Sequence, residues 1–158
     1  MKIFGICLIK NEVDIIAYCL EEQSKWADKI FVYDNGSTDG TWELVQKLAK
    51  NNDKIVPWKT EERPYHVFNE FRHMAKEGDW WCVKMDSDEF YIDNPKEFLT
   101  KVSKWHNTIT SIHYEYRLTH EDVEQCTFYN HFPEDRGNLR YYNHKQTSET
   151  RFFRHYDR

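Results

Sequence analysis

Strand and helix patterns alternate along the first two thirds of this chain, and that order constrains the possible folds most. Short apolar runs typical of buried strands cover residues 2–9, 29–33, 54–57 and 80–85. Between them, apolar residues recur at helical spacing over 12–24, after Gly40 and over 65–76, and a further helix opens at Asn94-Pro95. Strand–helix–strand repeats place helices on both faces of a parallel sheet. The sequence therefore predicts an α/β fold with a mostly parallel sheet flanked by helices.

The sequence pattern changes after Trp105, where polar and irregular segments alternate with short strand patterns. Strands are predicted over 108–116 and 126–130, with weaker candidates over 139–143 and 151–155. We expect an antiparallel or mixed section here, joined to the first part in one domain, 1–158, with halves 1–105 and 106–158. The chain stops at Arg158 directly after a strand-like segment, which fits either a truncated chain or a minimal domain.

Two of the predicted helices have apolar faces that we expect to pack against the sheet. On the helix over 65–76 and on the helix that opens at Asn94, these faces comprise Val67, Phe68, Phe71, Met74 and Ala75, and Phe98, Leu99, Val102 and Trp105.

Composition excludes several classes of protein. The net charge of −5 disfavours nonspecific binding to nucleic acid, which calls for a basic surface. No apolar run approaches the roughly 20 residues of a membrane-spanning helix, and the short apolar start reads as a strand and not as a signal peptide. The four cysteines form no C-x-x-C pair, so we expect reduced residues, mostly in the core, of a cytoplasmic protein.

An acidic cluster, Asp86-Ser87-Asp88-Glu89, begins where the apolar run 80–85 ends. Polar segments also follow the other predicted strands, at 10–12, 34–40 and 58–63. In a parallel sheet these four loops share one edge, which is the edge where open α/β sheets bind ligands. Two carboxylates one residue apart supply the hard oxygen ligands that Mg²⁺ and Mn²⁺ prefer. The sequence therefore predicts a ligand site with a divalent cation at this edge.

Three of these segments, taken in order, carry a family resemblance. Lys10-Asn11-Glu12, then the run Val32 to Thr41 (VYDNGSTDGT), then Met85-Asp86-Ser87-Asp88-Glu89 resemble the family 2 glycosyltransferases. The resemblance covers roughly residues 2–93 and implies the GT-A fold and a nucleotide-sugar donor, UDP- or GDP-linked. It makes 1–105 the nucleotide-binding half and 106–158 the acceptor-side half.

The resemblance also implies roles for individual positions. Asp86 and Asp88 would hold Mn²⁺ or Mg²⁺ against the donor diphosphate, whose negative charge as leaving group the ion neutralises. Asp39 matches a later position of the second motif, where helix capping is its expected role. Donor contacts would come from Asn11, Glu12, Asp34, Asn35, Arg63, Arg72 and Asp86; for Arg72, a surface helix residue is an equal alternative.

On the acceptor side, the resemblance implies a general base for an inverting enzyme, although retaining chemistry stays open. Asp122, in the compact cluster His120-Glu121-Asp122, is the candidate, with an exposed turn as the alternative. His131, His144 or His155 could add a metal ligand. The implied acceptor is a glycan or lipid-linked acceptor of polysaccharide biosynthesis, which places the protein in the cytoplasm or peripherally at the inner face of the membrane.

Three alternatives remain open. A haloacid-dehalogenase-like phosphatase also carries Asp-x-Asp after a strand, but on its first strand and followed by Thr, where this chain has Phe90 after the fourth strand. A receiver-like or other nonenzymatic α/β domain could use these acids structurally. A degenerate GT-A domain could bind nucleotide without transferring sugar. Metal-dependent binding of a nucleoside diphosphate, and then turnover, would separate these alternatives.

Overall fold

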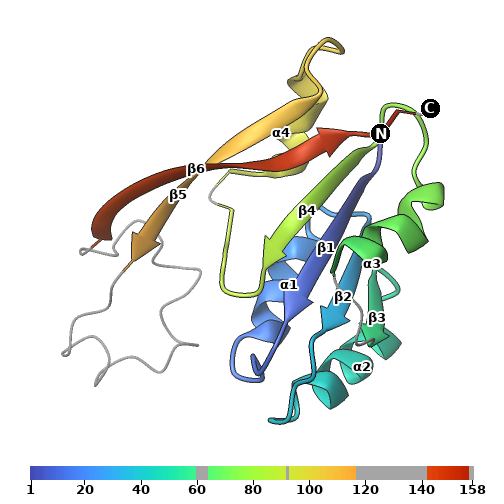
Figure 1. Ribbon diagram of the computed structural model, residues 1–158, viewed down its shortest axis with the longest axis vertical. Helices are drawn as coiled ribbons and strands as arrows, with labels where there is room; N and C mark the ends of the chain where they lie inside the picture. The colour runs from blue at the N-terminus through green and yellow to red at the C-terminus, as the bar shows by residue number, and fades with distance from the viewer. Residues whose placement is uncertain (60–63, 92, 117–141, 157–158) are drawn as a thin grey trace. The chain divides into compact units, whose positions relative to one another are not determined.

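A computed structural model describes residues 1–59, 64–91, 93–116 and 142–156, and it confirms the alternation of strands and helices (Figure 1). The strands are β1 (Ile3–Ile9), β2 (Lys29–Asp34), β3 (Ile55–Lys59), β4 (Trp80–Asp86), β5 (Thr108–Tyr116) and β6 (Tyr142–Arg154). The helices are α1 (Ile16–Ser24), α2 (Thr41–Asn51), α3 (Pro64–Phe71), the 3₁₀ turn η1 (Arg72–Met74) and α4 (Pro95–Lys101). In the part of the chain that the structure describes, no helix is long and apolar enough to cross a bilayer.

The chain divides into two compact units. Unit 1 comprises residues 1–109 and 151–158, and unit 2 comprises residues 110–150. The predicted single domain with halves 1–105 and 106–158 stays a prediction. The side-chain contacts discussed below lie within the described residues of unit 1.

The sheet is mostly parallel, as predicted. Strand β1 pairs in parallel with β2 on one side and β4 on the other, and β3 pairs in parallel with β2. Strand β6 pairs antiparallel with β4, giving the order β3-β2-β1-β4-β6-β5 and the mixed C-terminal section that the sequence predicts. We call the edge where β1 to β4 end the carboxyl edge, and the edge where they begin the amino edge.

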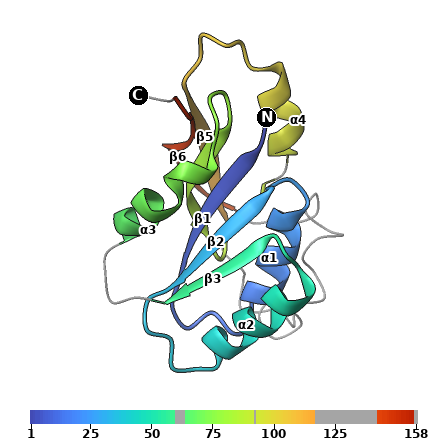
Figure 2. The same cartoon turned by 90° about the vertical axis from the view of Figure 1, so that its right-hand side faces the viewer.

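Apolar side chains cover both faces of this sheet, because successive residues of a strand point to opposite sides. On one face, Ile3 and Ile9 of β1 pack with Ile16 and Leu20 of α1. On the other, Phe4 stacks on Trp81, with ring centroids 5.1 Å apart. The view in Figure 2 shows α1 and α2 on one side of the sheet and α3 on the other. A sheet covered on both faces holds its loops at a fixed edge, which is what a ligand site needs.

Glycine at position 5 allows β1 and β4 to approach closely. A Cβ built on Gly5 would overlap Met85 Sδ and lie 2.9 Å from Met85 Cε. The register between β1 and β4 shifts between Gly5 and Cys7 at the same place. The side chain of Met85 thus fills the space that any larger residue at position 5 would need.

Helix ends differ from the sequence prediction in three places. Helix α1 begins at Ile16 and not at Glu12, because Glu12 lies in a turn whose carbonyl accepts hydrogen bonds from Ile15 and Ile16 N–H. Helix α3 ends at Phe71, and the chain after η1 turns extended at Ala75. Met74, predicted to lie in the core, is therefore 41% exposed.

The predicted apolar face of α4 is also wrong in part. Pro95 and Leu99, four residues apart, are its buried side chains, while Phe98 is 51% exposed. The helix ends at Lys101 because Val102 is extended, so helical spacing no longer places Trp105, which is 81% exposed. Strand β6 is one continuous strand of 13 residues in place of two weak candidates. The strand predicted over 126–130 lies outside the described residues.

Candidate functional site

Hydrogen bonds join the loops that follow β1 and β2 at the carboxyl edge. Asn11 Oδ1 accepts from the Thr38 N–H at 2.8 Å, and Asn11 N–H donates to Ser37 Oγ at 3.0 Å. Asn11 has a φ of 57°, a left-handed conformation that asparagine tolerates better than most residues. Glu12 N–H donates to Thr41 Oγ1 at 2.8 Å. Two of the four polar loops that the sequence singles out are thus fixed against each other.

Asp39 strengthens the same junction. Its carboxylate accepts from the N–H groups of Thr41 and Val13, at 3.0 and 3.2 Å. The hydrogen bond from the Thr41 hydroxyl lowers the pKa of Asp39. The N-cap residue of α2 is Gly40, with φ of 98°, so Asp39 binds the first N–H of the helix from one residue further out. Asp39 therefore accepts a hydrogen bond from the start of the helix, as expected, but it does so from the position before the N-cap residue.

Asp34 is fully buried at the end of β2. Its Oδ2 accepts from the Ser37 N–H at 3.1 Å and lies 3.7 Å from Lys59 Nζ. Among the described residues, its Oδ1 is buried without a hydrogen-bond partner. Buried carboxylate oxygens are costly to leave unpaired, so this atom marks a place for an external donor. Asn35 follows with an exposed side chain, while its N–H donates to the Ile9 carbonyl at 2.9 Å.

The loop after β4 meets the loop after β1 through Glu12. The Glu12 carboxylate is hydrogen-bonded to the side chain of Ser87, which is buried. Partial burial, reinforced by the negative charge of Asp88, raises the pKa of Glu12. Asp88 itself is exposed. The acidic side chains Glu12, Asp86, Asp88 and Glu89 therefore share one end of the sheet, where a cation would relieve their mutual repulsion.

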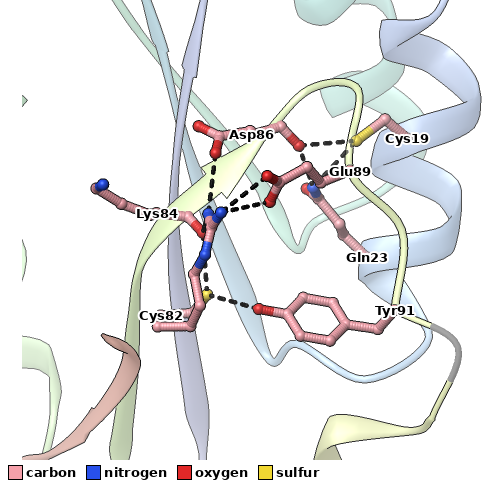
Figure 3. A network of polar contacts seen from close by, with 8 residues as sticks. Cys19, Gln23, Cys82, Lys84, Asp86, Glu89 and Tyr91 are labelled. Carbon is pink, nitrogen blue, oxygen red and sulfur yellow. Dashed lines mark hydrogen bonds and ion pairs between the residues drawn. The ribbon is translucent and has the colours of Figure 1, made fainter. Parts of the chain in front are cut away.

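A buried arginine that sequence reasoning missed supplies one such cation. Arg151 is only 2% exposed, and its guanidinium donates to Asp86 Oδ2 at 2.9 Å, to the Lys84 carbonyl at 2.8 Å and to Glu89 at 2.8 Å. The carboxylates of Asp86 and Glu89 thus converge on this guanidinium, and Figure 3 shows both carboxylates beside the end of β4. Burial alone would lower the pKa of Arg151, but the bond to Asp86 and the charge of Glu89 outweigh it and raise the pKa.

The antiparallel pairing of β6 with β4 explains this position. Cys82 lies opposite Phe152, so Arg151 comes next to the last residues of β4. In the sequence, Arg151 opens a weak strand pattern, Arg151-Phe152-Phe153-Arg154, that contains no motif. Only the identity of the neighbouring strand reveals which carboxylates it meets.

The other side of the Asp86 loop rests on α1. Gln23 Nε2 donates to Cys19 Sγ at 3.0 Å and to the Asp86 carbonyl at 3.4 Å (Figure 3). Burial raises the pKa of the Cys19 thiol, so it stays protonated near neutral pH. Cys7, Cys19 and Cys82 are buried free thiols, as the sequence predicts, and Cys126 lies outside the described residues. The loop that carries Asp86 is thus held from both sides.

Two residues proposed from the sequence, Arg72 and His155, do not join this cluster. Arg72 and His155 lie at the amino edge, where they line a pocket together, and β4, seven residues long, separates that edge from Asp86 by roughly 20 Å. The structure therefore does not bring Arg72 or His155 to the cluster around Asp86. His144 belongs to β6, and three candidates lie outside the described residues: Arg63, Asp122 and His131.

The carboxylate oxygens at this site can hold a hard divalent cation only if a bound ligand supplies further oxygen atoms. Among the described residues, no group of three or more His, Cys, Asp or Glu side chains is arranged to hold a metal ion. Asp86 and Asp88 offer carboxylate oxygens, and Arg151 engages Oδ2 of Asp86. Mg²⁺ and Mn²⁺ in nucleotide sites commonly take one or two carboxylates and complete their shell with phosphate oxygens. The residues fit such a shared site.

Comparisons with known proteins found a matching family and a similar fold. A family model described as Glycosyl transferase family 2 matches residues 6–157. The lipopolysaccharide core biosynthesis glycosyltransferase LpsC of Rhizobium meliloti (strain 1021) is 33% identical over 91 residues, covering 56% of this chain and 32% of that protein. The mannosyltransferase PcManGT from Pyrobaculum calidifontis, solved in complex with GDP-Man and Mn²⁺, superposes with a TM-score of 0.51 at 16% identity. That match covers 68% of this chain and 34% of PcManGT, so the chain spans about a third of each relative.

Proposed function

The chain belongs to glycosyl transferase family 2, and from this we propose that it transfers a sugar from a nucleoside diphosphate donor. One observation carries the proposal: three carboxyl-edge loops are joined around the buried Asp34 and the Asp86-x-Asp88 pair. The resemblance of the fold to a GDP-mannose-bound mannosyltransferase supports it at the level of the fold. A hexose on UDP or GDP is the donor that we propose.

Asp34 is our proposed nucleotide contact. Its Oδ1 is buried without a partner in the described structure, so a ribose hydroxyl or a base N–H would supply the missing donor. The backbone and side chains of Asn11, Glu12 and Asn35 surround the same edge and are proposed to line the nucleotide site. Arg63, which precedes α3, stays our proposed basic contact to the phosphates.

Asp86 and Asp88 are our proposed metal-binding residues, for Mn²⁺ or Mg²⁺. When bound, the ion neutralises the negative charge that develops on the diphosphate leaving group. Arg151 fixes Asp86 through Oδ2, so the exposed Asp88 is the carboxylate free to adjust to a ligand. Asp122 stays our candidate general base for an inverting reaction, and a glycan or lipid-linked molecule is the proposed acceptor, reached from the cytoplasm.

Calorimetric titration of UDP, GDP and CMP, each with and without Mn²⁺, tests the donor site. We expect one diphosphate to bind tightly only with the metal, and Asp88→Asn to abolish that metal dependence. Asp34→Asn should weaken nucleotide binding at least about 10-fold, the loss of one hydrogen bond to a charged group. Asp53→Asn is the matched control, because the Asp53 side chain is 94% exposed and lies beyond α2.

A folded protein that binds none of the three nucleotides would contradict the proposal, as would equal losses in the Asp53 control. Turnover of the matching nucleotide sugar with a glycan acceptor then separates a transferase from a degenerate domain that only binds nucleotide. In that assay, Asp122→Asn should leave donor binding intact and slow transfer.

A further inference from the structure

Exposed apolar side chains gather at the amino edge, opposite the candidate donor site. In the described part of the chain, seven large apolar residues are exposed, and five of them lie at this edge. Leu8 and Val13, toward the carboxyl edge, are the other two. The five are Met1 (49% exposed), Met74 (41%), Phe98 (51%), Trp105 (81%) and Tyr156 (38%).

A buried aspartate assembles three of the segments that carry these residues. The Asp79 carboxylate accepts from Lys2 N–H at 2.7 Å and from Lys76 N–H at 2.9 Å. The Asp79 carbonyl accepts from His155 N–H at 2.7 Å. The chain start, the segment after η1 and the end of β6 therefore meet at one place, and the N-terminus lies at the same end of unit 1 as α4 in both views (Figures 1 and 2).

Arg154 ties the segment that carries Trp105 to the same edge. Its guanidinium lies 4.5 Å from the ring centroid of Trp80 and donates to the carbonyls of Ser103 and His106, both at 3.2 Å. Trp105 stands between these two anchored residues. Its exposure is thus a fixed feature of the fold and not a consequence of a loose chain end.

The charge of this edge is opposite in sign to that of the whole chain. Exposed side chains of segments 1–2, 25–28, 52–54, 72–78, 93–106 and 155–156 include six Lys and Arg residues and four carboxylates, whereas the full chain has a net charge of −5. The basic residues are Lys2, Lys25, Arg72, Lys76, Lys101 and Lys104, and the acidic ones are Asp53, Glu77, Asp93 and Glu97.

Aromatic and basic side chains are combined here as they are at membrane interfaces. Tryptophan and tyrosine prefer the headgroup level of a bilayer, and lysine stems can lie along apolar surface while their charge stays in water. Lys104 Nζ lies 5.4 Å from the ring centroid of Trp105, which pairs the two at one spot. We propose that the amino edge of unit 1 binds the surface of a bilayer that contains anionic lipids.

A pocket in the same surface provides a binding place for a lipid headgroup. It has a volume of about 220 Å³ and is lined by Phe68, Arg72, Phe153, Arg154, His155 and Tyr156. Arg72 is exposed and provides the positive charge that a lipid phosphate needs, while Tyr156 provides an amphipathic ring. This surface does not depend on the proposed sugar transfer, because the donor residues lie at the other end of the strands.

Vesicle binding tests the proposal directly. Sedimentation with vesicles of phosphatidylcholine alone, and with about one third phosphatidylserine, should show binding only to the anionic vesicles and loss of binding at high salt. Trp105→Ser and the double variant Lys101→Glu/Lys104→Glu should each bind at least about 10-fold more weakly. Val13→Ser and Lys10→Glu/Lys47→Glu are matched controls outside the amino edge and should bind like the wild type.

Three results would overturn the proposal. The first is a folded wild-type protein that ignores anionic vesicles. The second is vesicle binding by the amino-edge variants that equals that of the wild type. An equal loss of vesicle binding in the control variants would count in the same way, because overall charge would then explain the effect. The third is a concentration-dependent dimer that Trp105→Ser dissociates, which would assign the surface to a second copy of the chain. Circular dichroism verifies that each variant is folded. If Trp105→Ser does not fold, the double lysine variant still tests the surface.

Discussion

Replacing Arg151 by methionine tests how the Asp86 loop is held. The change keeps much of the aliphatic volume but removes hydrogen bonds to the Lys84 carbonyl, Asp86 and Glu89. Breaking a fully buried ion pair costs about 3–5 kcal/mol. Here the carboxylates of Asp86 and Glu89 keep 47% and 35% side-chain exposure, so water can solvate them once the arginine is gone. We therefore expect the free energy of unfolding to fall by about 2–3 kcal/mol.

Urea denaturation followed by tryptophan fluorescence measures this loss, because Trp80 and Trp81 are fully buried and become exposed on unfolding. Arg72→Met is the matched control. It makes the same chemical change at an exposed position, so its effect should stay within about 0.5 kcal/mol. For a chain of this size, the Arg151 variant should also melt about 5–10 °C lower.

A double-mutant cycle with Asp86→Asn isolates the ion pair from the general loss of packing. Contacting charges should give a coupling energy of about 1–2 kcal/mol between the two sites. An Arg151→Met variant as stable as the wild type, or a coupling energy near zero, would refute the reasoning. Asp86 would then be positioned by its backbone alone.

Two further predictions concern stability away from Arg151. Gly5→Ala should destabilise the fold by about 1–3 kcal/mol, because the new methyl group meets buried Met85, and Met85→Ala in the same chain should recover part of that loss in urea denaturation. The folded pKa of Asp39 is lowered from 3.8, so its ionised form stabilises the fold above that pH, and this contribution is lost as the pH falls through the folded pKa. Asp39→Asn should therefore lower the melting temperature at pH 7, and its difference from the wild type should shrink in scans below pH 3.8; a difference that persists in acid would contradict this assignment.

Local sequence signals were sufficient for the parallel part of the fold. The apolar runs of β1, β2 and β4 are short and end in polar loops, so strand limits and the shared edge both follow from the pattern. The junction of the first two loops was also predictable as a juxtaposition. Its hydrogen bonds, such as Asn11 to Thr38, join residues 27 positions apart and depend on the pairing of β1 with β2.

The errors arise where tertiary contacts override periodicity. The helical spacing of Phe98 and Trp105 predicts one buried face, but α4 stops at Lys101, where the chain turns extended to meet Arg154. Arg72 has the residue type of a phosphate contact, but helix α3 runs back along the sheet and delivers it to the amino edge. In both cases the local sequence pattern does not determine where the residue lies in space.

Arg151 changes how the acidic motif itself should be understood. Four carboxylates, from Glu12, Asp86, Asp88 and Glu89, crowd one end of the sheet, and their negative charges repel each other unless positive charge is close. Arg151 supplies it permanently, from a strand that carries no motif and is separated by 65 residues from Asp86. The guanidinium thus holds and orients the side chains of Asp86 and Glu89 before any ligand arrives, while Asp88 stays exposed. The last strand of unit 1 is for that reason as much a part of the proposed donor site as the motif that identifies the family.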